Sequence, residues 1–221
     1  MPRPPVADPN TLVRFGILAL PLGNALKLVG NLGTFDSVGY GVPVSAEAAI
    51  AAGPGFFLGN LTGSITAVLF GLFGVLALFG FLVTRASERL VVPALVCSVL
   101  GSGFTLAALG VITYAIPALA HAYQAGDPGA MAVADGFFTW PSGAMLYPAV
   151  LVPIGLLLFC VALWRSTPVS RAAIITAAVS GMLISVPVPI HSIRLAGGVL
   201  GLLAGAWLAF VVRRDLARSP K

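Results

Sequence analysis

Charged residues are scarce in this chain. Asp, Glu, Lys and Arg together make up 9% of its 221 residues, whereas hydrophobic residues make up 58%. A soluble domain carries about 25% charged residues, so a water-exposed surface cannot be built from this composition. The mean hydropathy is +1.02. The sequence therefore predicts an integral membrane protein with a single membrane domain over residues 1–221.

Residues that carry chemistry are also few. The two cysteines, Cys97 and Cys160, lie inside apolar runs without CxxC spacing or a nearby histidine, which is typical of inert buried thiols. The sequence contains no Walker A or GxSxG motif, and no Asp or Glu lies in the core of an apolar run. The lack of acidic residues argues against proton or cation pumping. We expect no cofactor and no metal, and we favour a non-enzymatic protein.

Apolar runs long enough to cross a membrane occur along most of the chain. A spanning helix needs about 20 apolar residues. Six runs qualify, at residues 12–32, 56–83, 90–119, 144–164, 172–190 and 195–212. The expected fold class is therefore all-α, a polytopic membrane protein with six transmembrane helices.

The basic residues give this topology a direction. With the N-terminus inside, the outer side holds only Lys27 and Arg194, and every other basic residue falls on the cytoplasmic side: Arg3, Arg14, Arg85, Arg89, Arg165, Arg171, Arg213, Arg214, Arg218 and Lys221. Such a bias predicts cytoplasmic termini, and it explains the net charge of +5 without nucleic acid. We expect the membrane to be the cytoplasmic membrane of a bacterium. We expect the first ten residues and the tail after Arg213 to be mobile.

Two longer segments fall on the predicted outer side. Residues 33–55 contain Ser45 and Glu47, which suit the first turn of a short helix. Residues 120–143 contain Phe137, Phe138 and Trp140, aromatic rings that suit a membrane interface. Both segments are expected either to lie flat on the outer leaflet or to fold over the bundle.

Small residues recur at every fourth position in two of the runs. The sixth run holds Gly197, Gly201, Gly205 and Ala209, and the second holds Gly59, Gly63, Ala67 and Gly71. Small residues allow helix backbones to approach closely within lipid. The pattern predicts helix packing within the chain, with a homodimer or a membrane-complex partner through the sixth helix as the alternative.

The first run contains a polar stripe in the segment GNALKLVGN. Asn24, Lys27 and Asn31 follow i, i+3, i+7 spacing, which places them on one helix face. Lys27 alone is explained by snorkelling to the outer headgroups. Because lipid disfavours all three side chains, the stripe is also expected to face the bundle interior or an outward-open cavity. An acidic partner for Lys27 is then sought first in Asp135 and next in Asp36.

A second outer group contains His121 and Tyr123 after the third run, and His191 and Arg194 before the sixth. Without HxxxH, HxxE or HExxH spacing, a metal site is only weakly indicated, and solvated loop side chains are the plainer interpretation. Arg194 lies at the start of a helix, where the dipole disfavours a cation. It is therefore expected to have a partner such as a lipid phosphate or an acidic side chain.

Two stretches resemble a family of proteins. AEAAIAAGPGFFLGNLTG, which leads into the second run, and LLLFCVALWRSTPVSR, which leads into the fifth, resemble small six-helix membrane proteins of unknown function that are common in actinobacteria. The resemblance implies six helices and no particular activity.

Three functions follow as hypotheses. The first is a binding or accessory subunit whose outward-facing polar pocket, lined by the stripe, takes a lipid or amphiphile or docks a membrane partner. The second is a transporter or channel component. The third is an outer-leaflet enzyme that uses His121, Asp135 and His191.

Overall fold

The computed structural model describes residues 9–31, 44–137, 139, 149–167, 169–185 and 191–218, and its regular elements there are all helical. Within these residues, four helices are long and apolar enough to cross a membrane: Asn10–Gly30, Pro54–Leu82, Glu88–Gln124 and Leu195–Arg218. Two shorter apolar helices cover Leu151–Ser166 and Arg171–Ile184. The all-helical prediction is therefore confirmed, together with helices able to span a membrane.

Several long helices are assembled from shorter segments. The first comprises α1 (Pro9–Gly16) and α2 (Ala19–Asn31), the second α4 (Pro54–Gly59), η2 (Asn60–Ile65) and α5 (Thr66–Leu82), and the third α6 (Glu88–Gly110), η3 (Val111–Ala115) and α7 (Ile116–Gln124). The segments η2 and η3 are single turns of π-helix. The remaining helices are α3 (Val44–Ala51), α8 (Ala130–Gly136), α9 (Leu151–Ser166), α10 (Arg171–Ser185) and α11 (His191–Arg218).

The predicted mobile ends are wrong for residues 9–10 and 214–218, because α1 begins at Pro9 and α11 continues to Arg218. Leu216 is buried in the main core, and Asp215 lies 3.5 Å from Arg85 in an ion pair. These contacts order the last turns of the helix. Residues 1–8 and 219–221, which the same prediction covers, lie outside the described residues.

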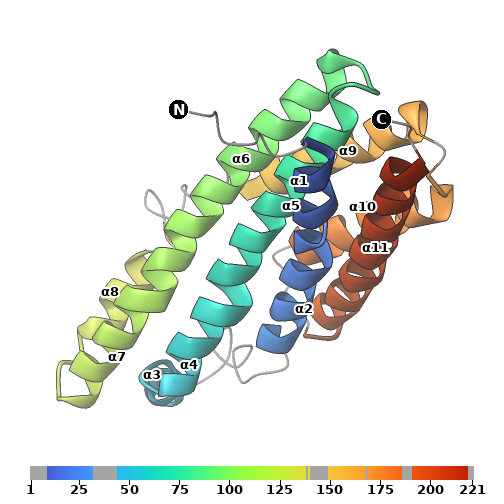
Figure 1. Ribbon diagram of the computed structural model, residues 1–221. Helices are drawn as coiled ribbons and strands as arrows, with labels where there is room; N and C mark the ends of the chain where they lie inside the picture. The colour runs from blue at the N-terminus through green and yellow to red at the C-terminus, as the bar shows by residue number, and fades with distance from the viewer. Residues whose placement is uncertain are drawn as a thin grey trace, which may run out of the picture.

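Six helices form a closed ring within the described part of the chain (Figure 1). Each helix contacts the next one around the ring, in the order α2, α5, α6, α9, α10, α11, and α11 contacts α2 again. Neighbours are antiparallel: Gly101 of α6 lies against Val152 of α9, for example, whereas Ser98 lies against Gly155. Short turns join α5 to α6 and α9 to α10, which explains why successive helices are neighbours in space.

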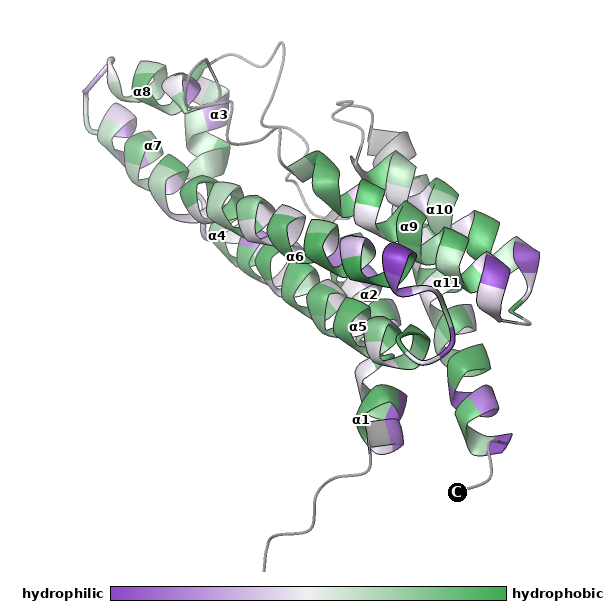
Figure 2. Cartoon of the chain, turned by 90° about the horizontal axis from the view of Figure 1, so that it is seen from above, coloured by the Kyte–Doolittle hydropathy of each residue, from purple (hydrophilic) through white to green (hydrophobic). Residues whose placement is uncertain are grey.

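The ring has two chemically different ends. At one end lie the start of α1, the α5–α6 turn, the α9–α10 turn and the end of α11, which together carry most of the arginines; we call this the arginine end. The opposite end, where α2 finishes, is called the lysine end after Lys27. Figure 2 shows hydrophilic residues gathered near helix ends and hydrophobic residues along the helix bodies.

The main hydrophobic core occupies the half of the ring nearer the arginine end. Its members include Phe81 of α5, Phe159 of α9 and Val212 of α11, each less than 3% exposed. All the core helices contribute one or more side chains there, and the side chains are entirely apolar. This half of the bundle is therefore packed like an ordinary protein interior.

A second, smaller cluster lies beyond the ring. Ala48 and Ala51 of α3, Ile116 of α7 and Met131 of α8 pack together there with Phe56. The helix Glu88–Gln124 has 37 residues and a length of about 55 Å, which exceeds a hydrocarbon core about 30 Å thick. The predicted outer segments 33–55 and 120–143 contain α3 and α8, respectively, and both helices pack on α7.

Candidate ligand site at the lysine end

The buried polar side chains of the described residues all lie on the lysine-end side of the main core. They are Asn60, Ser98, Ser102, Thr113 and Ser180. Each follows the core residues of its own helix in the direction of the lysine end, as Ser98 does after Val91 and Ala94. Buried polar groups within lipid are expensive unless they are paired or serve a ligand. The two halves of the ring therefore differ in chemistry as well as in position.

Their hydrogen bonds are only partly supplied by the protein. The Asn60 side-chain amide donates to the carbonyl of Phe56 at 3.1 Å, and the Ser180 hydroxyl donates to the carbonyl of Gly197 at 3.1 Å. The Thr113 hydroxyl is fully buried and has no partner among the described residues. Thr113 lies in the π-helical turn η3, next to the turn η2 that holds Asn60. Such turns frequently occur at functional sites.

Asn24 of the polar stripe lies inside the ring. A Cβ atom added at Gly201 of α11 would be 2.6 Å from the Asn24 side-chain oxygen and 2.7 Å from the Ser180 hydroxyl. The Asn24 amide nitrogen donates to the carbonyl of Leu20, 3.0 Å away. A polar contact region between α2, α10 and α11 is therefore possible because position 201 is glycine.

Lys27 occupies the same side of α2. Gly30 packs against η2 and Leu28 packs against α11, whereas Val29 is 67% exposed. At about 100° per residue, Lys27 lies between the directions of Gly30 and Leu28 and about 160° from Val29. Lys27 is half-buried. Its position on the helix is therefore on the interior side of the ring, opposite the lipid-facing side chains.

The start of α11 lies at the same level as the end of α2. Leu28 is beside Gly198, and Pro21 is beside Gly205, so the two helices are antiparallel. His191 and Arg194 belong to the first turn of α11, and Asn31 is the last residue of α2. The backbone thus brings these three positions to the lysine end. The side chains of all three, and the whole of Asp36, lie outside the described residues.

Asp135 and His121 are not brought to the stripe. Both side chains are exposed, on α8 and α7 respectively, and Figures 1 and 2 place these helices away from α2. Tyr123 is part of the small cluster around α7. The expected pairing of Asp135 with Lys27 therefore finds no support in this geometry, because α8 packs on α7. Among the described residues, no group of three His, Cys, Asp or Glu side chains could hold a metal.

The small-residue stripes pack within the chain. A Cβ at Gly63 would be 2.4 Å from the Cα of Gly30, one at Gly205 would be 3.1 Å from the nitrogen of Pro21, and one at Gly197 would meet Leu183 and Ile184. Gly71, in contrast, has open space where a side chain would be. Helix α2 thus packs closely against η2 and α5 on one side and against α11 on the other. These two contacts position the polar stripe.

The sequence interpretation missed a groove at the arginine end. A groove between the α1–α2 segment and α11 is lined by three arginines: Arg14, Arg213 and Arg214. The basic residues were assigned to membrane orientation alone. The signal available in the sequence was the position of Arg14 two residues inside an apolar run, which orientation does not require.

Comparison with known proteins adds no relatives. No protein-family model, curated protein or solved structure matches this chain. The resemblance to small six-helix bacterial proteins therefore stays a prediction, and function is inferred from the geometry.

Proposed function

We propose that the chain is a multi-pass protein of the bacterial cytoplasmic membrane with six spans and cytoplasmic termini. The ring of six antiparallel helices supports this topology. Helices α9 and α10 contain 16 and 15 residues, and apolar sequence continues beyond them at 144–150 and 186–190. The concentration of arginines at one end supports the orientation, because cytoplasmic segments carry the excess of basic residues.

In this membrane the protein acts as a non-enzymatic binding or accessory subunit. Its polar half faces outward and accommodates the headgroup of an amphiphile or lipid, or a polar segment of a membrane partner. The observation that carries this proposal is the distribution of the buried polar side chains of the described residues, all of which lie on the lysine-end side of the main core. A purely structural bundle has no reason to distribute its buried polar groups in this way.

Asn24 and Lys27 belong to this half, on the interior side of α2. Lys27 is half-buried and shares the interior side of α2 with Asn24, and an amino group and an amide on one face suit a ligand that carries a phosphate, sulfate or carboxylate next to an apolar body. The proposal extends the stripe to Asn31 and Arg194, which share the same end of the bundle.

Native mass spectrometry on protein gently extracted from its own membrane tests this function. Wild-type protein should retain an amphiphile or a partner chain, and Lys27→Met, which keeps the stem and removes the charge, should lose it. Lys27→Arg should retain it, and Arg89→Gln, an exposed charge at the opposite end, serves as the matched control. An unchanged set of bound molecules in folded Lys27→Met protein would refute the proposal.

A further inference from the structure

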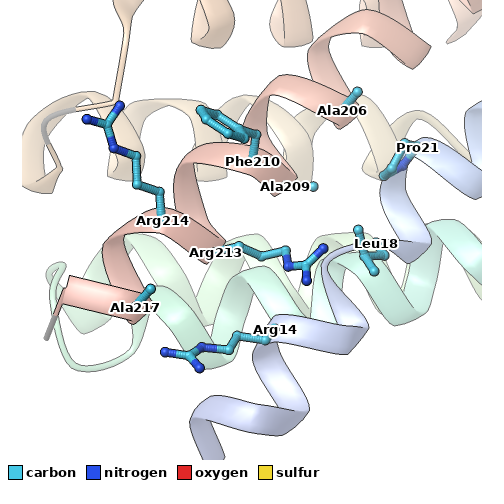
Figure 3. A pocket seen from close by; sticks show the side chains of 9 residues that line it. All are labelled: Arg14, Leu18, Pro21, Ala206, Ala209, Phe210, Arg213, Arg214 and Ala217. Carbon is cyan, nitrogen blue, oxygen red and sulfur yellow. The ribbon is translucent and has the colours of Figure 1, made fainter. Parts of the chain in front are cut away.

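The groove at the arginine end is a mixed basic and apolar cavity of about 480 Å³. Its basic part is supplied by Arg14, Arg213 and Arg214, and its apolar part by Leu18, Pro21 and Phe210. Figure 3 shows Arg213 extending from α11 toward Leu18, Arg14 extending in the other direction toward Ala217 near the end of α11, and Arg214 pointing away from both. The lining residues that the structure describes include no carboxylate.

Arg14 is held in a way that membrane orientation does not require. Its guanidinium donates to the carbonyl of Leu216, one of the last carbonyls of α11, which lack partners within the helix. Its Nε atom is buried and has no hydrogen-bond partner among the described residues. A charge that only sets orientation stays in water, because burying an unpaired N–H group is costly. Arg14 therefore fixes the end of α11 through this bond and also lines the groove.

The apolar part of the groove lies on the membrane side of the arginines. Phe210 is 61% exposed and lies about one helical turn from Arg213 toward the middle of α11. Pro21 and Leu18 line the opposite wall. An occupant that satisfies both parts has an anionic group at the arginines and an aliphatic chain directed along the helices into the bilayer.

We propose that this groove binds an anionic phospholipid, whose phosphate is bound by Arg213, with Arg14 adding positive charge to the same groove, while one acyl chain lies along Leu18, Pro21 and Phe210. Guanidinium groups bind phosphate oxygens through paired charge-assisted hydrogen bonds, and basic hollows between spanning helices suit anionic headgroups. The site is separate from the polar half of the ring. With the orientation proposed above, the bound lipid belongs to the inner leaflet.

Lipid titration of the purified full-length protein by native mass spectrometry tests the proposal. Phosphatidylglycerol should bind more tightly than phosphatidylcholine of the same chain length, since only the former carries net negative charge. Arg213→Gln should weaken phosphatidylglycerol binding about tenfold or more, the effect of losing one charge-assisted contact. Arg213 is exposed, and its substitution leaves the hydrogen bond from Arg14 to Leu216 in place. This variant is therefore preferred to Arg14→Gln, which removes that bond and could prevent folding.

The control variant is Arg89→Gln, which removes an exposed arginine of the arginine end that does not line the groove. It should bind phosphatidylglycerol like the wild type, and so should Lys27→Met, which separates this site from the proposed function. Equal binding by the Arg213→Gln and Arg89→Gln proteins would overturn the proposal. So would displacement of the lipid by millimolar inorganic phosphate, because the site would then recognise a free anion.

Discussion

The two halves of the ring are built from the same six helices but use different chemistry. Toward the arginine end, the interior is filled by large apolar side chains such as Phe81, Phe159 and Leu163. Toward the lysine end, buried positions within the ring include small and polar residues such as Gly63, Gly201 and Ser180, and the large buried side chains Phe56, Ile116 and Met131 lie beyond the ring. Close backbone approach replaces side-chain packing in this half of the ring.

This difference separates stability from binding. Large interlocking side chains leave no room for a ligand and fix the helices relative to one another. Small residues hold the helices together by close backbone approach, and this leaves polar groups such as the Asn24 amide and the Ser180 hydroxyl within the contact region. One half thus acts as the scaffold, and the other half has the composition expected of a site.

The largest expected effect is a loss of scaffold packing. Phe159 is fully buried in the core of the arginine-end half, whereas Phe73 is 59% exposed. Phe159→Ala should lower the free energy of unfolding by about 3 kcal/mol because it leaves a cavity that the surrounding helices cannot fill. The measurement is an SDS titration in mixed micelles, with Phe73→Ala as the control. Similar losses for both variants would show that this half is not the packed scaffold.

A smaller loss is expected from filling the close contact between α2 and η2. A Cβ at Gly63 would be 2.4 Å from the backbone of Gly30, whereas one at Gly71 would meet nothing within 4 Å. Gly63→Ala should therefore destabilise the protein by about 1–3 kcal/mol through overpacking. Gly71→Ala should be neutral or slightly stabilising. Equal effects in the same titration would argue against a backbone-to-backbone contact at the lysine end.

The scaffold was the more predictable half. Long apolar runs indicated the helices, and glycine spacing indicated close packing, because both features follow from local sequence and the chemistry of lipid. The first run was placed at 12–32, and the structure has a helix at Asn10–Gly30. The contact between Gly63 and Gly30 could not be predicted from the sequence, because helix periodicity identifies the face of a helix but not the helix that packs against it.

The site was predictable only as a direction. Spacing placed Asn24 and Lys27 on one face, and the packing of α2 puts that face on the interior side of the ring. The expected partnership with Asp135 rested on its place in a segment predicted to lie at the outer membrane interface, whereas in the structure α8, which carries Asp135, packs on α7. Thr113 was not singled out because a threonine within an apolar run normally bonds to its own helix, as Thr62 does to the carbonyl of Leu58. The Thr113 hydroxyl has no such partner among the described residues.

Removal of the unpaired hydroxyl should stabilise the bundle and weaken binding. Thr113→Val keeps the shape of the side chain and removes a buried donor that has no partner among the described residues. The free energy of unfolding should rise by up to about 1 kcal/mol in the absence of ligand. Thr62→Val, which removes an exposed hydroxyl bonded to the carbonyl of Leu58, is the control. Lower retention of the copurified amphiphile by Thr113→Val alone would assign the hydroxyl to the site; loss of stability would contradict this assignment.

The smallest expected effect concerns the ion pair at the arginine end. Arg85 and Asp215 lie 3.5 Å apart, with side chains 27% and 37% exposed. Arg85 also donates to the carbonyl of Phe81 and lies over its ring, so Arg85→Gln alone removes more than the ion pair. A double-mutant cycle with Asp215→Asn isolates the pair, and its coupling should be about 0.2–1 kcal/mol and smaller in 1 M salt.

A coupling above about 2 kcal/mol would change the comparison, because values of that size belong to desolvated pairs rather than to partly exposed ones. The arginine-end half would then be held by buried charge as well as by apolar packing. With a small coupling, the fixed position of α11 is explained by Leu216 in the core and by Arg14 at its last carbonyls. Arg14 would then both hold the end of α11 and line the groove at the arginine end.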